Sequence, residues 1–445
     1  MSEISNNEAH LFTPAESGHA IAIVEALQAE GHQAYLAGGC VRDGLLKRVA
    51  KDFDVVTSAE PNDVLELFPR SRRVGAHFSI VLVPTDPGQP GLEVATFRGE
   101  DEKSSSAAED ALRRDFTVNA LFWDPVSQVL LDEVGGQADV EARIIRCCGL
   151  AEERFKADPI RLLRAIRFAC VLEFEIESST WKAICSSVDL IESVSKERIA
   201  GELSKMWLCP FRLKAFDLLV DSGLMSRILP EILKLRGCEQ PPQFHPEGDV
   251  FVHTRRVLDN LPVEAGLELV WSALLHDIAK PATAEFDEKA GRIRFIGHEN
   301  LGAEMSRDIL QRLKYSNDTI ARVSSMVSQH MLFHQVKRMK RSKLRRLMGQ
   351  PYFEELLALH RADSLGGKGD LSRYEFMLNK AKEFANEPLI PKALLTGRDL
   401  LELGVAPGVQ IGKTLRQVQD LQLEGELKSR EEATDWVKAE LLKPS

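Results

Sequence analysis

The sequence predicts a small mixed α/β head followed by an all-α neck, body and tail. Short segments of alternating apolar and polar residues fill the first part of the chain, whereas apolar residues recur every three or four positions from about residue 150 onward. A chain of 445 residues is also too long for one hydrophobic core. We expect a head over 1–146, a neck over 147–236, a body over 237–385 and a tail over 386–445.

The head is expected to start with an amphipathic helix over 19–30 and to contain a helix over 61–68. Its strands are expected near 33–37, 51–57, 79–83, 92–97 and 118–131. The neck is expected to be helical from its start. The segment 237–248, with three prolines, is expected to lie at the boundary between neck and body.

Composition excludes several classes of protein. No stretch is long and apolar enough to span a bilayer, and the polar opening residues lack the apolar centre of a signal peptide, so we expect a cytoplasmic protein with no membrane partner. Seven cysteines without a C-x-x-C pair argue against a disulfide framework and a cysteine-based zinc site. The net charge of −10 argues against a surface coated with positive charge, but leaves room for a local basic track.

The first candidate site is the run from Leu36 to Asp43, where Gly38 and Gly39 end one strand and open a helix. Glycines let backbone N–H groups approach a triphosphate, and Arg42 in the first turns of the helix adds positive charge there. The simpler interpretation of the glycine pair is a turn without a ligand.

Two carboxylates follow on the next expected strand, Asp52 and Asp54. The period of two residues along a strand directs both to one face, and such a pair repels unless a divalent cation lies between, which predicts a Mg²⁺ site. Glu93 lies on another expected strand and is a candidate third catalytic carboxylate, although an exposed strand residue has the same pattern.

Three more segments make a family resemblance specific: 113–120 (Arg-Arg-Asp-Phe-Thr-Val-Asn-Ala), 154–168 around Asp158-Pro-Ile-Arg-Leu-Leu-Arg, and 195–199 (Ser-Lys-Glu-Arg-Ile). With the opening motif, they resemble the bacterial-type (class II) tRNA nucleotidyltransferases and the related bacterial poly(A) polymerases. The resemblance covers nearly the whole chain and implies a nucleotidyltransferase head with Mg²⁺ held by Asp52 and Asp54. The nucleotide-binding positions that it implies are Gly39, Arg42, Arg114, Asp115, Asn119, Asp158, Arg161, Arg164 and Arg167.

The resemblance also implies how bases are chosen without a template. Asp158 and Arg161, three positions apart, are expected to share a helix face and to offer one acceptor and one donor. Cytosine and adenine both present an amino donor beside a ring-nitrogen acceptor, whereas guanine and uracil present the reverse order. Alone, this pair would be read as an ordinary salt bridge on a surface helix.

Two departures from the family pattern affect specificity. Ala157 stands where the family usually has Glu, which puts the support of Arg161 and base selection in question. The stretch between Arg98 and Arg113 is shorter than expected and lacks the Tyr-Ser-Asp-Gly-like segment of relatives that add the final A. This favours a CC-adding enzyme over a CCA-adding one, although a neutral deletion explains a short loop equally well.

The body carries spaced imidazoles and carboxylates around an adjacent His-Asp pair, a combination that suits a divalent metal. The series resembles the HD phosphohydrolase domain, which implies one metal on His253, His276, Asp277 and Asp363 and a second held with the help of His298 and His330. A helical RNA-binding body with a vestigial site is the alternative interpretation.

Two further segments resemble RNA-contacting regions. Seven of the ten residues in 337–346 are Lys or Arg, which fits an RNA surface or simply a solvated helix face. The segment 395–400 resembles the family's tRNA-contacting tail, and a helix-capping loop fits it too.

We therefore expect an enzyme that transfers CMP, and in the CCA-adding case also AMP, from CTP and ATP to the 3′ end of tRNA. The rival within the family is a poly(A) polymerase, against which the segment 75–81 argues because it looks more tRNA-specific. Rivals outside the family are a phosphohydrolase whose head only binds nucleotide, and a non-catalytic RNA-binding protein.

Overall fold

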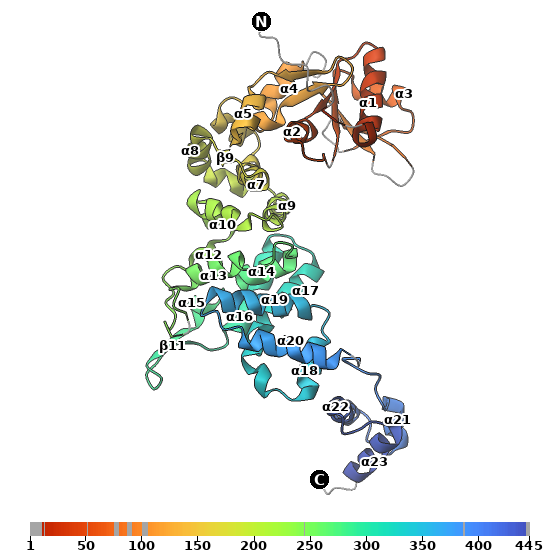
Figure 1. Ribbon diagram of the computed structural model, residues 1–445, viewed down its shortest axis with the longest axis vertical. Coiled ribbons are helices and arrows are strands. Elements are labelled where there is room, and N and C mark those ends of the chain that lie inside the picture. Colours follow the sequence, from red (N-terminus) through yellow and green to blue (C-terminus); the bar gives the residue numbers. More distant parts are fainter. Residues whose placement is uncertain are drawn as a thin grey trace. The chain divides into compact units, whose positions relative to one another are not determined.

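A computed structural model describes residues 11–12, 14–50, 52–74, 80–86, 91–99, 106–243, 245–385 and 388–441. The chain divides into two compact units, Met1–Ile228 and Leu229–Ser445. In Figure 1 the first unit runs from red to green and the second from green to blue. None of the helices in the described ranges is both long and apolar enough to cross a membrane.

The first unit is organised on a mixed sheet whose described strands follow the order β3-β4-β5-β2-β1-β6-β7. The pair β2 and β5 is parallel, and the other neighbouring pairs are antiparallel. The strands are β1 (Ala34–Ala37), β2 (Asp54–Thr57), β3 (Arg72–Arg73), β4 (Ile80–Val83), β5 (Leu92–Thr96), β6 (Leu121–Asp124) and β7 (Val129–Asp132).

The helices of the first unit flank this sheet and then continue as the neck. Those of the head are α1 (Pro14–Ala29), α2 (Gly39–Leu45), α3 (Pro61–Leu67), α4 (Ala107–Arg113), the 3₁₀ turn η1 (Thr117–Asn119) and α5 (Gly136–Ala142). Those of the neck are α6 (Ala151–Ala157), α7 (Arg161–Leu172), α8 (Ser178–Ser186), η2 (Val188–Ser193), α9 (Lys196–Trp207), α10 (Arg212–Asp221) and α11 (Leu224–Ile228). A short parallel pair, β8 (Ile144–Ile145) and β9 (Glu175–Ile176), links the end of the head to the neck.

Within its described residues, the second unit consists of helices, turns and one hairpin, β10 (Ala284–Asp287) with β11 (Arg292–Phe295). Its body comprises α12 (Pro230–Leu233), α13 (Val250–Asp259), α14 (Leu267–Leu275), α15 (Lys280–Thr283), α16 (His298–Arg312), α17 (Asn317–Gln329), η3 (His330–Arg338), α18 (Arg341–Met348), α19 (Phe353–Gly366) and α20 (Ser372–Phe384). Three helices, α21 (Gly397–Glu402), α22 (Val409–Glu424) and α23 (Arg430–Leu441), pack around their own small apolar cluster at the C-terminal end.

The predicted fold class, a mixed α/β head followed by helices, is confirmed. The expected strand over 118–131 is wrong, because this stretch forms a 3₁₀ turn and a hairpin of β6 and β7. The Asp124 carboxylate accepts hydrogen bonds from the backbone N–H of Val126 (2.9 Å) and Ser127 (3.3 Å), which closes the turn. The strand expected over 51–57 begins only at Asp54.

Gly136 fixes how closely α5 approaches η1. A Cβ atom at this position would lie 2.2 Å from the backbone oxygen of Thr117 and 3.0 Å from the Leu121 side chain. The end of η1 carries Asn119, one of the predicted nucleotide-binding residues. The close packing of Gly136 against Thr117 therefore helps to set the position of Asn119.

We expect Gly136→Ala to lower the free energy of unfolding by about 2 kcal/mol, because backbone has to move to admit the methyl group. Gly201→Ala on α9 is the matched control, since nothing lies within 4 Å of its Cβ position. The control is expected to be neutral or to stabilise by up to about 1 kcal/mol. Urea unfolding monitored by circular dichroism measures both, and equal stability of the two variants would contradict the close approach.

Candidate active site and metal centre

The three head carboxylates lie on or beside two adjacent parallel strands. β2 begins at Asp54, which is in register with Glu93 on β5. Asp52 precedes the strand by two residues, and all three side chains are exposed to solvent. Phe53, between the two aspartates, and Val55, after Asp54, are buried, 8% and 0% exposed. The structure thus shows the alternation that the sequence predicts, with Glu93 placed next to Asp54.

The negative charges of the three head carboxylates repel one another. Desolvation by the surrounding protein, together with the negative charges of Glu93 and Asp52, raises the pKa of Asp54 even though its side chain still reaches solvent. Arg114 opposes this shift. A divalent cation bound here would relieve the repulsion, so the donor set suits Mg²⁺. In the described part of the chain, however, the acidic and histidine side chains that converge most tightly lie in the body.

Gly38 shapes the turn between β1 and α2. Its φ of +73° is in the region that favours glycine, and a Cβ atom would lie 3.0 Å from the Arg114 guanidinium. Its own N–H donates to the backbone oxygen of Leu121 at 2.9 Å. Glycine is therefore required here by conformation and by the close approach of Arg114, and Gly39 then opens α2.

A chain of hydrogen bonds runs from the head to the neck. Arg42, 7% exposed, donates to the side-chain oxygen of Asn119 and to Asp43 at 2.7 Å. Asn119 in turn donates to Asp115 at 3.1 Å. The other oxygen of Asp115 accepts two bonds from Arg164 on α7, at 2.8 and 2.5 Å. Four predicted nucleotide-binding residues thus form one connected network.

Burial raises the pKa of Asp115, but the charge and hydrogen bonds of Arg164, with those of Asn119, outweigh it and hold the pKa below its usual value. Both oxygens of Asp115 are occupied by the protein. Asp115 is therefore placed to hold Arg164 and Asn119 in position.

Phe168 is a residue that sequence reasoning missed. Its ring lies 4.0 Å from the guanidinium carbon of Arg167, 5.3 Å from that of Arg164 and 5.5 Å from that of Arg42. Glu202 on α9 was missed as well, and it accepts a 2.5 Å bond from Arg167. The signal was present in both cases, since Phe168 ends the neck motif and Glu202 follows the 195–199 segment, but neither residue type marks a nucleotide site by itself.

The expectation that Asp158 and Arg161 share a helix face is wrong. Asp158 follows the end of α6 with φ −152° and ψ 95°, and α7 begins only at Arg161. The Asp158 carboxylate accepts a 3.0 Å bond from Arg198, and Arg161 donates to the backbone oxygen of Arg113 at 2.9 Å. Pro159 accounts for the break, because the residue before a proline is disfavoured in helical conformation.

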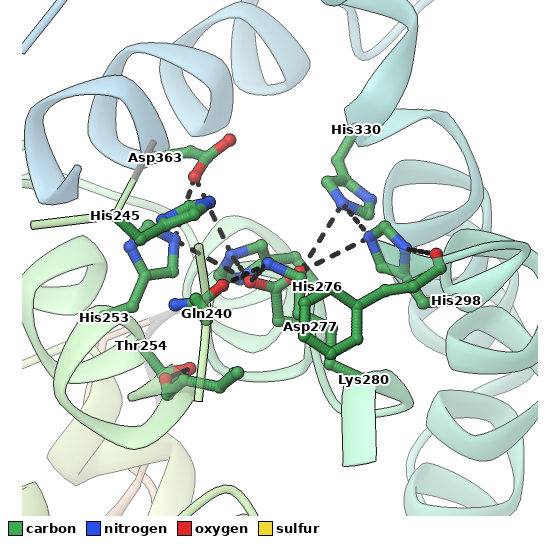
Figure 2. A network of polar contacts seen from close by, with 12 residues as sticks. Gln240, His245, His253, Thr254, His276, Asp277, Lys280, His298, His330 and Asp363 are labelled. Atoms are coloured by element: carbon green, nitrogen blue, oxygen red, sulfur yellow. Dashed lines mark hydrogen bonds and ion pairs between the residues drawn. The ribbon is translucent and has the colours of Figure 1, made fainter. Parts of the chain in front are cut away.

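Five candidate ligand side chains of the body gather around the Asp277 carboxylate, as Figure 2 shows. On one side of Asp277, His276 Nε2 lies 3.1 Å and His253 Nε2 3.8 Å from its Oδ2. Asp363 lies 2.9 Å from His253 Nε2 and 3.9 Å from His276 Nε2. These four residues are those expected to hold the first metal, and the structure brings them together.

The other oxygen of Asp277 faces the remaining pair of imidazoles. Its Oδ1 lies 3.5 Å from His298 Nε2 and 3.8 Å from His330 Nε2. The two Nε2 atoms are 3.3 Å apart. Figure 2 shows both rings pointing toward one another and toward Asp277. Asp277 thus bridges two candidate metal positions.

The opposite edges of these rings are fixed by backbone. The Nδ1 atoms of His276, His298 and His330 bond the carbonyl oxygens of Ala273, Phe295 and Val327 at 2.9, 2.6 and 2.6 Å. A carbonyl only accepts, so each Nδ1 carries a proton, and Nε2 is the ring nitrogen that faces inward.

Burial and the neighbouring His276 lower the pKa of His330 to about 3, which keeps this ring neutral. The buried His276 Nε2 faces Asp277 Oδ2 at 3.1 Å. Imidazole nitrogens and carboxylate oxygens that converge in a buried cluster are the donor set expected of metal ligands. The body residues therefore fit a divalent metal.

Small residues bring the ligand helices together. Gly302 on α16, one turn after His298, would place a Cβ 3.3 Å from Val327. Gly366 on α19, one turn after Asp363, would place a Cβ 2.9 Å from Val257 on α13. These close approaches set the separation of the helices that carry the ligands.

The structure adds ligand-type residues that sequence reasoning missed. Glu247 bonds both His253 and His245, and Lys280 lies 2.7 Å from Asp277 Oδ2. The Lys280 ammonium also donates to Gln240 at 2.7 Å. Three of these residues, His245, Glu247 and Gln240, lie in the proline-rich segment that the sequence marks as a boundary. Such a segment has no periodic pattern that would predict the direction of their side chains.

The basic run over 337–346 is only partly available to a ligand. Arg345 is 4% exposed and donates to the backbone oxygens of Pro388 and Leu389, and Arg346 pairs with Asp420 at 2.8 Å. The segment 395–400 forms a capping box, in which Thr396 and Asp399 bond each other's backbone N–H. RNA contact by these two segments stays a prediction.

Comparison with protein-family models finds three matched regions. Residues 34–146 match the poly(A) polymerase head domain, residues 173–235 match the probable RNA- and SrmB-binding site of polymerase A, and residues 250–366 match the HD domain. These matches cover the head, most of the neck and the histidine-rich body.

Relatives of known activity align over almost the full length. A CC-adding tRNA nucleotidyltransferase from Thermus thermophilus is 31% identical over 423 residues, which are 90% of this chain and 92% of that protein. An A-adding tRNA nucleotidyltransferase from Deinococcus radiodurans is 31% identical over 91% of this chain and 94% of that protein. A CCA-adding enzyme from Streptococcus thermophilus is 28% identical over 95% of this chain and 96% of that protein.

Solved structures show the same fold. The CCA-adding enzyme of Bacillus stearothermophilus, determined in complex with CTP, is 25% identical with a TM-score of 0.75, over 97% of this chain and 98% of that chain. A Thermotoga maritima CCA-adding enzyme complexed with tRNA is 20% identical with a TM-score of 0.65, over 97% of both chains, and shows likeness of fold alone.

We expect Asp115→Asn to lower the free energy of unfolding by about 2 kcal/mol at pH 7, because it removes the charge that Arg164 bonds. Pairing lowers the pKa of Asp115 in the folded protein. The advantage of the original protein is therefore present above the unfolded pKa of about 3.9 and is lost as pH falls through the lowered value. Urea unfolding of both proteins between pH 7 and the lowest pH at which they fold measures this difference.

Asp189→Asn is the control. Asp189 pairs with Arg227 at 2.6 Å, but the two side chains are 75% and 42% exposed. An exposed pair contributes about 0.5 kcal/mol or less. A loss at Asp115 no greater than the loss at Asp189 would show that the head-to-neck network is not a stabilising feature.

Proposed function

Because the chain belongs to the bacterial-type tRNA nucleotidyltransferase family, we propose that it adds CMP, and in the CCA-adding case AMP, to the 3′ end of immature tRNA. The observation that carries the proposal is the strand register that sets Asp54 beside Glu93, with Asp52 two residues before Asp54. Full-length similarity to tRNA nucleotidyltransferases supports it.

Each group of the head has a role in this proposal. Asp52 and Asp54 hold the cation, and Glu93 adds a third negative charge to the set. Mg²⁺ bound there would lower the pKa of the RNA 3′-hydroxyl and neutralise the leaving pyrophosphate. Gly38 and Gly39 leave room for phosphate beside α2, and Arg42 and Arg114 place positive charge at that turn.

Selection of the base is assigned to the neck. Arg161, Arg164 and Arg167 succeed one another along α7 at three-residue spacing, and Asp158 lies just before it. Desolvation lowers the pKa of the Arg161 guanidinium, while the charges of Asp115 and Asp158 oppose that shift. Asp158 thus acts electrostatically on Arg161 from outside the helix, and we assign the acceptor for cytosine and adenine to Asp158 and the donor to Arg161.

CC addition is the favoured product because the stretch between Arg98 and Arg113 is short. Residues 100–105 of this stretch lie outside the described residues, as do residues 75–79 of the segment that argues for tRNA over other RNA. Relatives of similar identity include CC-adding, A-adding and CCA-adding enzymes, so their names do not separate these products.

The test uses a tRNA transcript that lacks its 3′ CCA, incubated with CTP, with ATP, and with both. We expect two additions from CTP and no third addition when ATP is present, counted at single-nucleotide resolution on a denaturing gel. A third nucleotide would identify CCA addition. Long tails from ATP on an arbitrary RNA would identify a poly(A) polymerase instead.

Asp54→Asn provides the control for the mechanism. Loss of one metal-holding carboxylate removes several kcal/mol of transition-state stabilisation, so we expect the rate of addition to fall about 1,000-fold or more with an unchanged circular dichroism spectrum. Addition within tenfold of the original rate would rule out the role given to Asp54.

We propose a second activity, metal-dependent phosphate-ester hydrolysis, for the body. The specific observation is the pair of Nε2 atoms of His298 and His330, 3.3 Å apart beside Asp277, with each Nδ1 bonded to a backbone carbonyl. Divalent metal held by these two rings, and by the group of His253, His276 and Asp363 on the other side of Asp277, would activate water against a phosphate ester. The chain's own contribution is to fix three imidazoles, those of His276, His298 and His330, with Nε2 facing inward.

We expect His276→Ala to abolish metal-stimulated release of p-nitrophenol from bis-p-nitrophenyl phosphate, by about 100-fold or more, and to leave nucleotide addition in place. Asp54→Asn should have the opposite pattern. The two variants are assayed for both reactions with Mg²⁺, Mn²⁺, Co²⁺ and Ni²⁺. Hydrolysis that survives His276→Ala would show that the body does not catalyse it. If neither the original protein nor Asp54→Asn hydrolyses the ester, the body only binds its ligand.

A further inference from the structure

His253 differs from the other three candidate metal-binding histidines in the group that its Nδ1 atom contacts. His276, His298 and His330 each bond a backbone carbonyl through Nδ1. His253 Nδ1 instead donates to the Glu247 carboxylate at 2.7 Å. An ionised carboxylate accepts a stronger hydrogen bond than a neutral carbonyl and pushes more electron density onto the ring.

Glu247 is held firmly for this contact. Its side chain is 0% exposed, and its Oε1 also accepts a bond from His245 Nδ1 at 2.9 Å. The segment behind it turns at Gly248, whose φ is +116°. Asp249 then caps α13 through the N–H of Val252 at 2.9 Å and receives the N–H of Gly237 at 2.7 Å. The carboxylate is therefore part of a tethered loop.

Charge is distributed unequally between the two metal positions. The position near His253 and His276 has the Asp363 carboxylate as well as Asp277 Oδ2, with the Glu247 carboxylate behind the His253 ring; the Lys280 ammonium, 2.7 Å from that Oδ2, adds one positive charge there. Among the described residues, the carboxylate oxygen that faces the position near His298 and His330 is Asp277 Oδ1. Glu299, the acidic neighbour there, lies 3.7 Å from His298 Nδ1, whose hydrogen bond goes to Phe295.

On the premise of the body metal site proposed above, we propose that Glu247 is a positioning residue that fixes and polarises His253, so that the His253 position binds a divalent metal more tightly than the His298 position. The two positions then fill in order. Glu247 touches neither metal nor substrate, and acts through the His253 ring.

The test is a Co²⁺ titration of the full chain, followed by calorimetry and by visible absorption, which reports imidazole coordination. Every protein carries Asp54→Asn, which removes the central carboxylate of the head site and weakens metal binding there. Two binding phases are expected without further change. Glu247→Gln gives His253 the same kind of neutral acceptor that the other three histidines have, and should weaken the tighter phase about tenfold while the weaker phase stays in place.

Two variants assign the phases. Glu299→Gln removes a charge of the same kind from the same cluster without removing a ring hydrogen bond, and should move neither phase by more than about twofold. His330→Asn should abolish the weaker phase alone. Equal effects of Glu247→Gln on both phases, or no effect on either, would overturn the role of Glu247. If the parent protein takes up no Co²⁺ in the body, the proposed metal site itself fails.

A measurement on the unaltered chain covers the case in which Glu247→Gln does not fold. With Zn²⁺ bound and histidines labelled with ¹⁵N, the Nδ1 proton of His253 should resonate far downfield and exchange slowly, because it is buried in a bond to a carboxylate. Comparison with His253→Gln assigns the signal. A ring whose Nδ1 carries no proton would contradict the proposal.

Discussion

A buried carboxylate has to be compensated by positive charge or by hydrogen-bond donors, and both candidate sites of this chain are organised around one such group. In the first unit the group is Asp115, 6% exposed, and in the second it is Asp277, 2% exposed. Each carboxylate is contacted by side chains from several helices or loops. Its hydrogen bonds and ion pairs therefore hold these elements together at the candidate site.

The two carboxylates are compensated in different ways. Asp115 is met by the permanent charge of Arg164 and by amide donors, so its oxygens are fully used within the protein. Asp277 is met by Lys280 on one oxygen and by imidazoles whose Nε2 atoms face it. The first arrangement is a structural joint between head and neck, whereas the second keeps the capacity to bind a cation.

This difference bears on how nucleotide recognition is built. Phe168 and the Asp115 network hold the guanidinium groups of Arg42 and Arg164 at defined positions. A planar group that is already oriented loses little further freedom when it binds a ligand, so recognition gains precision at small entropic cost. The neck then contributes to nucleotide selectivity in two ways, because it supplies the charge of its arginines and fixes the orientation of their guanidinium groups.

The sequence by itself determined the fold class, the opening motif, the alternation of exposed and buried residues from Asp52 to Val55, and the four histidines that gather around Asp277, because residue type and local periodicity carry that information. It failed at two local breaks in the periodic pattern. Pro159 separated Asp158 from the helix of Arg161, and Asp124 closed a hairpin inside an expected strand.

Glu247 meets His245 and His253 from a loop, where no periodic pattern predicts which way a side chain points. Only the tertiary structure decided that Glu202 bonds Arg167 and that Arg42 contacts Phe168. A hydrogen bond or ring contact between residues far apart in the chain leaves no periodic trace along it.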